Sequence, residues 1–318
     1  MEAYILTQNG GIENLQKNTL ATPQPANGEV LIKTKGIGIN PIDSQVRNFK
    51  QVLDMITNGN IPDRVVLGWD LAGVIAQVGP GVENFKAGDE VFGLINMPGL
   101  GQTYATYVTA SASQLTLKPS NLSFTTAAAT PMAALTAWQA VVTLGKIKKG
   151  ERVLIHGASG GVGHFAVQMA KYFGGYVIGS GSAKNESFVK GLGADEFLDY
   201  AAVPFEQKVK DVDVVIDTIN SVQHVLRSIN VIKTGGRLVF LQPHFQIEIA
   251  GHLEAAKISG HGVFVHSSGK ELNEIAGLIE TGHLNPHVSS VLSFDQLPEA
   301  HRLLENGRAA GKIAIAVN

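Results

Sequence analysis

The sequence lacks cysteine altogether and has little charge for a chain of 318 residues. Without cysteine, disulfide bonds, thiolate metal ligands and a cysteine nucleophile are excluded, and the composition fits a reducing compartment, so we expect a cytoplasmic protein. Charged residues make up only 16% of the chain, and the formal net charge is −2. Lysine and arginine are scattered, which indicates neither a nucleic-acid partner nor a polybasic membrane patch. The N-terminal segment Met1–Ile5 has no basic region, so no signal peptide is expected.

A long stretch without any charge lies between Lys118 and Lys146. Its length resembles that of a membrane span, but it contains Pro119, Pro131 and several threonines, which a bilayer span would rarely tolerate together. We therefore expect a buried helix at the junction of two domains, and no membrane as a partner.

Length and hydrophobic patterning predict two domains in an α/β fold, because domains run to roughly 100–200 residues. Up to about residue 120, short apolar runs with frequent Gly and Pro, such as Val30–Lys35 and Val65–Val78, predict a small, irregular β-barrel. Farther along, expected strands alternate with helices and cover residues 152–156, 176–179, 196–198, 212–216, 237–241 and 262–266. Six such strands imply a parallel, doubly wound sheet. The strand–helix–strand pattern of residues 287–318 is expected to return to the first domain.

The segment Val153–Gly163 runs from a short apolar strand into a glycine-rich turn and then into a helix. The helix has apolar residues at spacings of three and four, and Gly174-Gly175 provides its stop signal. Such a turn presents backbone N–H groups at a helix N-terminus, where they can bind a pyrophosphate. A plain strand–turn–helix without a ligand is the alternative.

The residues after the second strand of the predicted sheet indicate which nucleotide the turn binds. Sheets that select NAD carry Asp or Glu about 20 residues past the glycine turn, where it binds the ribose hydroxyls. Here Ser180, Ser182 and Lys184 follow, and the first carboxylate is that of Glu186. Because serine and lysine suit the oxygens of a 2′-phosphate, we expect NADPH in preference to NADH. A solvated loop after a strand would show the same residues.

Ordered motifs extend over nearly the whole chain. They are Gly36–Asp43 followed by Arg47, Leu67–Val74, Gly88–Gly93, Ala134–Trp138, the glycine turn, and Leu192–Asp195 running to Tyr200. Together they resemble the medium-chain dehydrogenase/reductase superfamily, and specifically its zinc-independent quinone and enone oxidoreductases. The resemblance implies a GroES-like, β-rich catalytic domain from residues 1–122 and 267–318, and a doubly wound Rossmann domain that binds NADP from residues 123–266. It also implies a homodimer, because relatives commonly pair through the edge of the Rossmann sheet.

The resemblance bears on metal chemistry as well. Zinc-dependent relatives place Cys where this chain has Asn40, and a His-Glu pair where it has Trp69-Asp70. A catalytic zinc with its thiolate ligand and a structural four-cysteine zinc therefore cannot form. His283 and His287 have i,i+4 spacing, but Pro286 lies between them in a segment that reads as a loop. The remaining histidines considered, which follow no ligand spacing, are His244, His252, His261 and His266. We expect no metal ion.

The resemblance implies cofactor contacts for individual residues. The residues that would meet the pyrophosphate are Ser159, Gly160, Gly161 and Val162. Those that would surround the 2′-phosphate are Ser180, Ser182, Lys184 and Tyr200. Those that would line the route to the nicotinamide are Thr136, Leu241, Val265, His266 and Arg308, with Asn40 facing the reacting ring. Plainer interpretations remain open, with Tyr200 as an aromatic that closes a strand, Arg308 as a surface charge and Asn40 as a turn former.

The substrate pocket leaves a weaker signal. Phe49, Trp69 and Met132, with Asn40, are candidates for the wall that meets a flat acceptor, and Trp69 fits the core equally well. No pair of residues stands out as general acid and base, so the catalytic residues are left unassigned. Asp43 is interpreted as structural because its motif places it beside a turn.

The chemistry that remains favours a conjugated acceptor. Without a Lewis acid, hydride addition to the β-carbon of an enone is easier than reduction of a simple ketone, because the product enolate spreads its charge. The hypothesis is NADPH-dependent reduction of a quinone or of the C=C bond of an α,β-unsaturated carbonyl, with the proton from water or a nearby hydroxyl. Two alternatives stay open: a non-catalytic NADPH-binding sensor or structural protein, and a 2-enoyl-thioester reductase.

Overall fold

The computed structural model describes residues 1–307 and 310–318, and the chain divides into two compact units. Unit 1 consists of Met1–Leu135, Val265–Gly282 and Pro286–Asn318, so both ends of the chain contribute to it. Unit 2 consists of Thr136–Phe264 and His283–Asn285. The domain limits at residues 122/123 and 266/267, which the family resemblance implies, remain a prediction. The two units are described one at a time.

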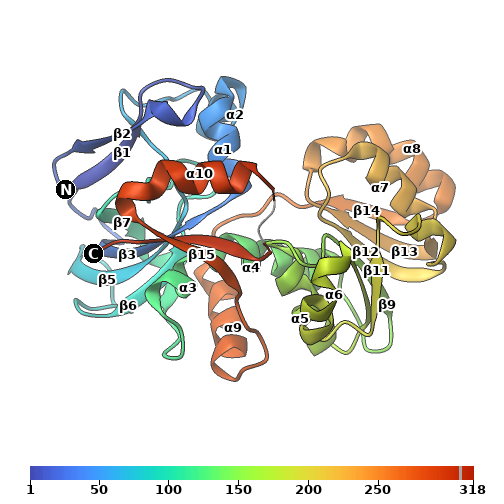
Figure 1. The fold of residues 1–318 in the computed structure, drawn as a ribbon. Helices are drawn as coiled ribbons and strands as arrows, with labels where there is room; N and C mark the ends of the chain where they lie inside the picture. Colours follow the sequence, from blue (N-terminus) through green and yellow to red (C-terminus); the bar gives the residue numbers. More distant parts are fainter. Residues whose placement is uncertain (308–309) are drawn as a thin grey trace. The chain divides into compact units, whose positions relative to one another are not determined.

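Unit 1 is built on two β-sheets, and several of their strands are labelled in Figure 1. The larger sheet has the order β15-β16-β3-β5-β6-β8, with β7 paired to β3. Its strands are β3 (Glu29–Ile39), β5 (Asp70–Val78), β6 (Glu90–Leu94), β7 (Tyr107–Ser111), β8 (Leu115–Leu117), β15 (Val288–Ser293) and β16 (Lys312–Ala316). The smaller sheet consists of β1 (Glu2–Leu6), β2 (Leu15–Thr19) and β4 (Val65–Val66). Because β16 pairs antiparallel with β3, the C-terminal strand completes a sheet begun near the N-terminus.

The helices of unit 1 are α1 (Pro41–Asn48), α2 (Lys50–Thr57), α3 (Phe124–Ala128), α9 (Gly269–Glu280) and α10 (Leu297–Glu305). The starts of α1 and α9 have recognisable caps. Proline suits the first position of α1, and the Asp43 carboxylate accepts the Asn40 backbone N–H at 2.6 Å. Ser268 caps α9 by accepting the Glu271 N–H at 3.2 Å. Both starts are therefore explained by local sequence.

The charge-free stretch folds into short helical segments. It contains α3, α4 (Pro131–Trp138) and the π-helical segment η3 (Gln139–Leu144), and the boundary between the units in the sequence falls within α4. Among the helices of residues 1–307 and 310–318, none combines the length and the apolarity that a bilayer crossing requires.

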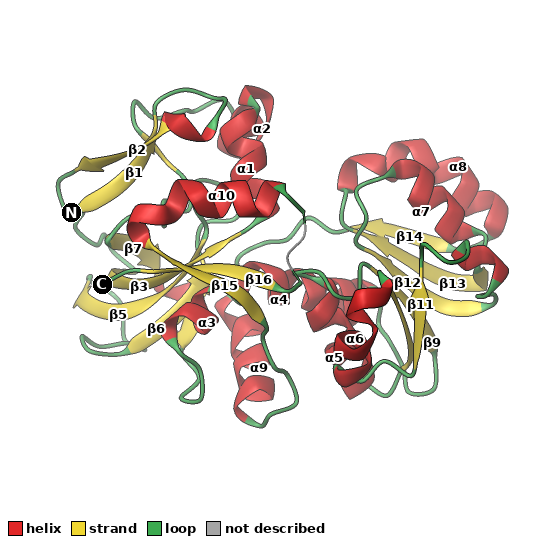
Figure 2. Ribbon diagram, viewed as in Figure 1, coloured by secondary structure: helices red, strands yellow, loops and turns green. Residues whose placement is uncertain are grey.

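Unit 2 contains a parallel sheet of six strands with helices on both sides (Figure 2). Its strands are β9 (Arg152–His156), β10 (Tyr176–Gly181), β11 (Glu196–Asp199), β12 (Val212–Asp217), β13 (Ile232–Phe240) and β14 (Ser259–Gly262). Its helices are α5 (Gly163–Tyr172), α6 (Glu186–Gly191), α7 (Val222–Ile229) and α8 (Gln246–Ala256). The order β11-β10-β9-β12-β13-β14 reverses direction at β9, as in a doubly wound dinucleotide fold. The predicted doubly wound sheet is confirmed.

One strand of this sheet lies earlier in the sequence than predicted. The apolar run at residues 262–266 suggested the sixth strand, but β14 spans Ser259–Gly262 and only Gly262 is shared. A Cβ on Gly262 would lie 2.5 Å from the Pro243 Cα, and one on Gly260 would lie 2.4 Å from a Leu253 methyl group. Neighbouring elements thus pack so closely on β14 that glycine is needed there, and this closeness outweighs the strand propensity of the apolar run.

One core cluster of unit 2 lies between the sheet and the helices α7 and α8. Alternate strand residues such as Leu154, Val215 and Leu238 pack there against Val225 of α7 and Leu253 of α8. Because side chains alternate across a strand, the last residues of β9 and β12 point to this same face.

Candidate functional site

The glycine-rich turn joins the end of β9 to the start of α5. Gly157 has φ +65°, and a Cβ on it would lie 2.3 Å from the Thr218 Oγ1. A Cβ on Gly163 would lie 2.1 Å from the Gly157 carbonyl oxygen, so the helix can approach the strand only with glycine at this position. No side chain caps α5 at Val162. The turn therefore offers backbone N–H groups to an anion.

The loop after β10 approaches the glycine turn. Ser180 is buried within β10, Ser182 precedes the short helix η4 (Ala183–Asn185), and Lys184 is exposed on it. The Asn185 side chain donates a hydrogen bond of 2.9 Å to the Ser159 hydroxyl of the turn. Sequence reasoning missed Asn185, and its only sequence signal is a polar side chain directly after the lysine.

Tyr200 follows β11, at the same carboxyl end of the parallel strands as the loop after β10. Its backbone N–H donates to the Gly181 carbonyl at 3.2 Å, and its residue is 63% exposed. Asp199, the residue before Tyr200, brings a carboxylate into this region. It is in register with Gly181, and it accepts the Ala201 N–H at 3.1 Å. The structure thus places Ser159, Ser182, Lys184 and Tyr200 at the carboxyl ends of neighbouring strands, while their contacts with a cofactor remain predictions.

The residues predicted along the nicotinamide route fall in different parts of the chain. Thr136 is buried in α4, and Leu241 follows β13, where its N–H donates to the Asp217 carbonyl at 3.2 Å. Both belong to unit 2, whereas Val265 and His266 belong to unit 1. The His266 Nε2 lies 4.0 Å from a Glu271 carboxylate oxygen. Arg308 lies outside the described residues.

Unit 1 contains a buried polar cluster around Asn40. The Asn40 side-chain amide donates to Asp70 at 2.9 Å, and its carbonyl oxygen accepts from the Lys312 ammonium. Lys312 also donates to the Ile39 carbonyl at 2.9 Å, and Asp70 accepts the Met132 N–H at 2.8 Å. These bonds satisfy the Asn40 side chain within the unit. They favour the turn-forming interpretation of Asn40, and its contact with a reacting ring remains a prediction.

The acidic members of this cluster have perturbed pKa values. Burial raises the pKa of Asp43 to about 8, although the hydrogen bond from Asn40 acts against the change. Burial also raises the pKa of Asp70 to about 6, with Lys312 acting against it. Burial lowers the pKa of Lys312, while the two carboxylates act to raise it. Asp43, interpreted from sequence as structural, thus belongs to a buried group of titratable residues.

The three apolar candidates for the substrate pocket differ in exposure. Trp69 is 0% exposed and its Nε1 donates to the Gly99 carbonyl at 2.6 Å, which favours the core interpretation. Met132 is buried at the start of α4, where its backbone N–H binds Asp70. Phe49 lies between α1 and α2 and is 56% exposed. A pocket role remains a prediction for all three.

Comparisons with known proteins agree with this arrangement. Residues 26–120 match the family model of the alcohol dehydrogenase GroES-like domain, and residues 192–315 match that of a zinc-binding dehydrogenase. The chain is 33% identical to the zebrafish (Danio rerio) mitochondrial NAD(P)H oxidoreductase RTN4IP1, over 91% of this chain and 84% of that protein. It is 32% identical to the 2-methylene-furan-3-one reductase of Solanum lycopersicum, over 99% of this chain and 79% of that protein.

Solved structures show the same likeness. The quinone oxidoreductase of Coxiella burnetii has a TM-score of 0.92 and 32% identity, covering 100% of this chain and 99% of its own. The Escherichia coli quinone oxidoreductase, solved in complex with NADPH, has a TM-score of 0.85 and 26% identity, covering 99% of this chain and 100% of its own. With its GroES-like segment, its doubly wound sheet and relatives of this extent, the chain belongs to the medium-chain dehydrogenase/reductase superfamily and is an oxidoreductase of its NAD(P)H-dependent quinone and enone group.

Proposed function

We propose that the protein is an NADPH-dependent reductase that transfers hydride to a quinone or to the C=C bond of an α,β-unsaturated carbonyl. The observation that carries this proposal is the uncapped N-terminus of α5 after the glycine turn, with Ser182 and Lys184 beyond the neighbouring strand. The names of the relatives support it, since they include an enone reductase and quinone oxidoreductases, one of them bound to NADPH.

The residues of unit 2 fit a phosphorylated dinucleotide. The amide groups of Ser159, Gly161 and Val162 would hold the pyrophosphate, because the glycine cradle leaves no side chain between the turn and the ligand. The Gly160 N–H donates to the Gly157 carbonyl at 2.8 Å and shapes the turn. Ser182 and Lys184 would bind the 2′-phosphate, with the exposed Tyr200 beside them. Asp199 accepts a backbone N–H at 3.1 Å, and Glu186 is exposed on α6. When bound, the nicotinamide supplies the hydride.

The donor set in unit 1 does not fit a catalytic zinc ion. At the positions where zinc-dependent relatives carry ligands, this chain has Asn40 and Trp69-Asp70. The Asn40 carbonyl oxygen accepts from the buried Lys312 ammonium, whose charge would repel a divalent cation. We therefore propose zinc-independent hydride transfer. An acceptor conjugated to a carbonyl suits such a site, because its enolate needs less electrostatic help, and the proton would come from water or a nearby hydroxyl.

An assay of 1,4-benzoquinone and short enones with both nicotinamide cofactors tests the function. We expect oxidation of NADPH with at least one acceptor of these two classes, and a higher kcat/KM with NADPH than with NADH. Tight NADPH binding without turnover of any acceptor would contradict the enzyme proposal and support the non-catalytic alternative. Turnover of 2-enoyl thioesters alone would keep a reductase but replace its substrate class.

The substitution Lys184→Ala tests the 2′-phosphate site. Loss of one charge-assisted hydrogen bond, worth roughly 1.5–3 kcal/mol, should reduce the NADPH/NADH ratio of kcat/KM by about tenfold or more. Lys190→Ala is the matched control, because Lys190 is also exposed and lies on the following helix α6. An unchanged ratio in Lys184→Ala would show that this lysine does not bind the 2′-phosphate.

We also infer a homodimer that pairs through an edge of the six-stranded sheet, as the family resemblance implies. The edge strands of that sheet are β11 and β14. Light scattering of the purified protein should give twice the mass of one chain, and a monomer at micromolar concentration would contradict the inference.

A further inference from the structure

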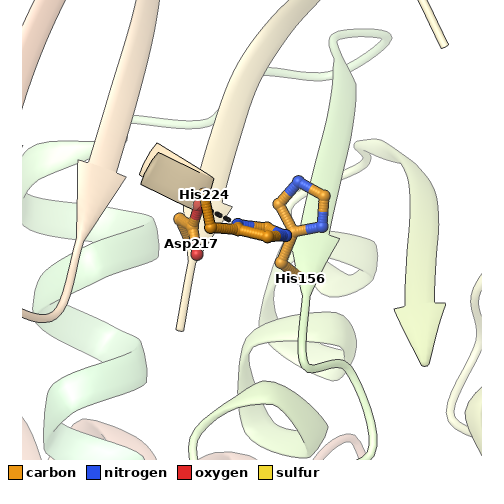
Figure 3. Close-up of side chains that lie close together, drawn as sticks. All are labelled: His156, Asp217 and His224. Carbon is orange, nitrogen blue, oxygen red and sulfur yellow. Dashed lines mark hydrogen bonds and ion pairs between the residues drawn. The ribbon is translucent and has the colours of Figure 1, made fainter. Parts of the chain in front are cut away.

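Two histidines and an aspartate gather in unit 2, where His156 directly precedes the glycine turn (Figure 3). His156 ends β9 and Asp217 ends β12, and the two are direct register partners in parallel strands. Both point to the face that packs against α7, together with Leu154 and Val215 two residues earlier. His224 comes from the first turn of α7. One nitrogen or oxygen atom from each of the three side chains lies within 4.8 Å of the others.

Hydrogen bonds fix the orientation of His224. Its Nδ1 lies 2.8 Å from the Asp217 Oδ2, which also accepts the Ser228 hydroxyl at 2.9 Å. The other carboxylate oxygen accepts the Ile219 N–H at 2.9 Å. Because the carboxylate acts as an acceptor in all these bonds, the His224 Nδ1 is the donor toward Asp217, and Nε2 is not engaged by this carboxylate. Figure 3 shows this second nitrogen on the side of the ring next to His156.

His156 is a buried polar group whose hydrogen-bonding capacity is unused. It is 1% exposed, and within the part of the chain that the structure describes neither of its ring nitrogens has a hydrogen-bond partner. Its neighbours are rings, with centroids 4.5 Å away for Phe205 and 4.4 Å away for His224. Buried polar atoms without partners are rare, because their desolvation is not repaid by any bond. A ligand that accepts a nitrogen lone pair would resolve this imbalance.

We propose that His156, His224 and Asp217 bind one divalent transition-metal ion, with Zn²⁺ as the best chemical match. Two imidazoles and a carboxylate are donors that zinc takes, and a water molecule completes four-coordination. Zinc bonds of about 2.0–2.2 Å place tetrahedral ligand atoms about 3.3–3.5 Å apart, so side-chain shifts of roughly an ångström close the site. The ion would replace the hydrogen bond between His224 and Asp217. The proposal is independent of the reductase function and departs from the expectation that the chain binds no metal.

The surroundings permit a cation to enter and remain. Arg227, on the same helix as His224, is ion-paired with Glu206, so its positive charge is balanced. The His224 side chain is 20% exposed, which opens the cluster to solvent on one side. The bound ion would link the ends of β9 and β12 to α7, and its binding should therefore stabilise unit 2.

Metal titration of the full-length protein without a polyhistidine tag tests the proposal. After removal of metal with a chelator, we expect one Co²⁺ per chain with the visible absorption of tetrahedral coordination, displaced by Zn²⁺. Zn²⁺ should also raise the Tm. His224→Gln and Asp217→Asn should each weaken Zn²⁺ binding by about tenfold or more. His252→Gln is the matched control, because His252 is an exposed histidine on α8 of the same unit, and its binding should equal that of the unaltered chain.

A further variant separates metal binding from folding. His156→Phe places an apolar ring among rings, so it should keep the circular dichroism spectrum and the metal-free Tm while losing the bound Co²⁺. The proposal is overturned if the unaltered chain binds no stoichiometric metal, or if His224→Gln and His252→Gln bind it equally. It is also overturned if His156→Phe retains the Co²⁺ spectrum. NADPH turnover is measured in parallel, since its loss or retention concerns the reductase proposal alone.

Discussion

Each unit buries a polar cluster around an aspartate, and the pKa values of the two aspartates are shifted in opposite directions. In unit 1, Asp70 accepts from the Asn40 amide and the Met132 N–H, and burial raises its pKa to about 6. In unit 2, burial likewise acts to raise the pKa of Asp217, but the hydrogen bond from His224 and the neighbouring imidazoles lower it below its usual value. Burial alone therefore does not set the charge of a buried carboxylate, because the number and placement of its donors can outweigh desolvation.

The source of compensating charge also differs between the clusters. Lys312 supplies a buried ammonium beside Asn40 and Asp70 in unit 1, where two carboxylates share one cation. Asp217 instead relies on a backbone N–H, a hydroxyl and an imidazole. The first cluster is thus held by charge and the second by directed hydrogen bonds.

Unit 1 contains Trp69 and unit 2 contains Trp138, and the chain has only these 2 tryptophans, so single-tryptophan backgrounds report each unit separately.

The largest effect should come from Lys312→Met. Removing the ammonium leaves Asp70 buried without its compensating cation, which should destabilise unit 1 by about 3–5 kcal/mol. Urea unfolding in a Trp138→Phe background, read by Trp69 fluorescence, measures this loss. A loss below about 1 kcal/mol would show that the Lys312 ammonium does not hold the first cluster together.

Asp217→Asn should have a smaller effect on unit 2. The amide cannot accept on both sides as the carboxylate does, so one buried donor loses its partner, at a cost of about 1–3 kcal/mol. Unfolding in a Trp69→Phe background, read by Trp138 fluorescence, measures it in the absence of metal. A loss as large as that of Lys312→Met would erase the difference between the clusters.

The pH dependence of stability should have opposite signs for Asp43 and His156. The folded state raises the pKa of Asp43 from 3.8 to about 8, so folding holds a proton and stability falls as pH rises toward 8. Burial lowers the pKa of His156 from 6.5 to about 4, so unfolding takes up a proton and stability rises between these values. Each slope is at most about 1.4 kcal/mol per pH unit.

Two variants separate these slopes. Burial and Arg47 lower the pKa of His301 from 6.5 to about 3, and Asp70 titrates near pH 6, so unit 1 is best compared between pH 6.5 and 8. Asp43→Asn should flatten the decline of unit 1 in that window. His156→Phe should remove the rise of unit 2 between pH 4 and 6.5. Unchanged profiles in both variants would contradict the assignment of these slopes.

The smallest effect is expected for Ser228→Ala. The hydroxyl of Ser228 donates to Asp217 at 2.9 Å and also contacts the His224 carbonyl at 3.1 Å. Its removal leaves two donors on the carboxylate, and the loss should be about 0.5–1.5 kcal/mol. The pH profile provides the sharper readout, since the pKa of Asp217 should rise with one donor fewer. A stability loss without any change in that profile would indicate a packing effect.

Much of unit 2 could be predicted because its signals are local. The strand, glycine turn and helix of Val153–Tyr172 follow from consecutive residues, and four of the six expected strands overlap their observed positions closely. The strand expected at 237–241 corresponds to β13, which already begins at Ile232. The sixth strand lies earlier than expected, because Leu253 and Pro243 pack so closely on it that only glycine fits at 260 and 262, and no local pattern reveals this packing. Trp69 illustrates the same limit, since its sequence context fits a pocket as well as the core, and its burial favours the core.

The candidate sites divide along the same line. The ordered motifs carried the family resemblance. Hydrophobic period and glycine placement predicted the doubly wound sheet, and the missing cysteines excluded a thiolate zinc, because each depends on residue type and short spacing. The partnership of Asn40 with Lys312, and that of His156 with Asp217 and His224, came only from folding. These residues are distant in sequence, and they meet because β16 returns beside β3 and β12 lies beside β9, so strand order sets their chemistry.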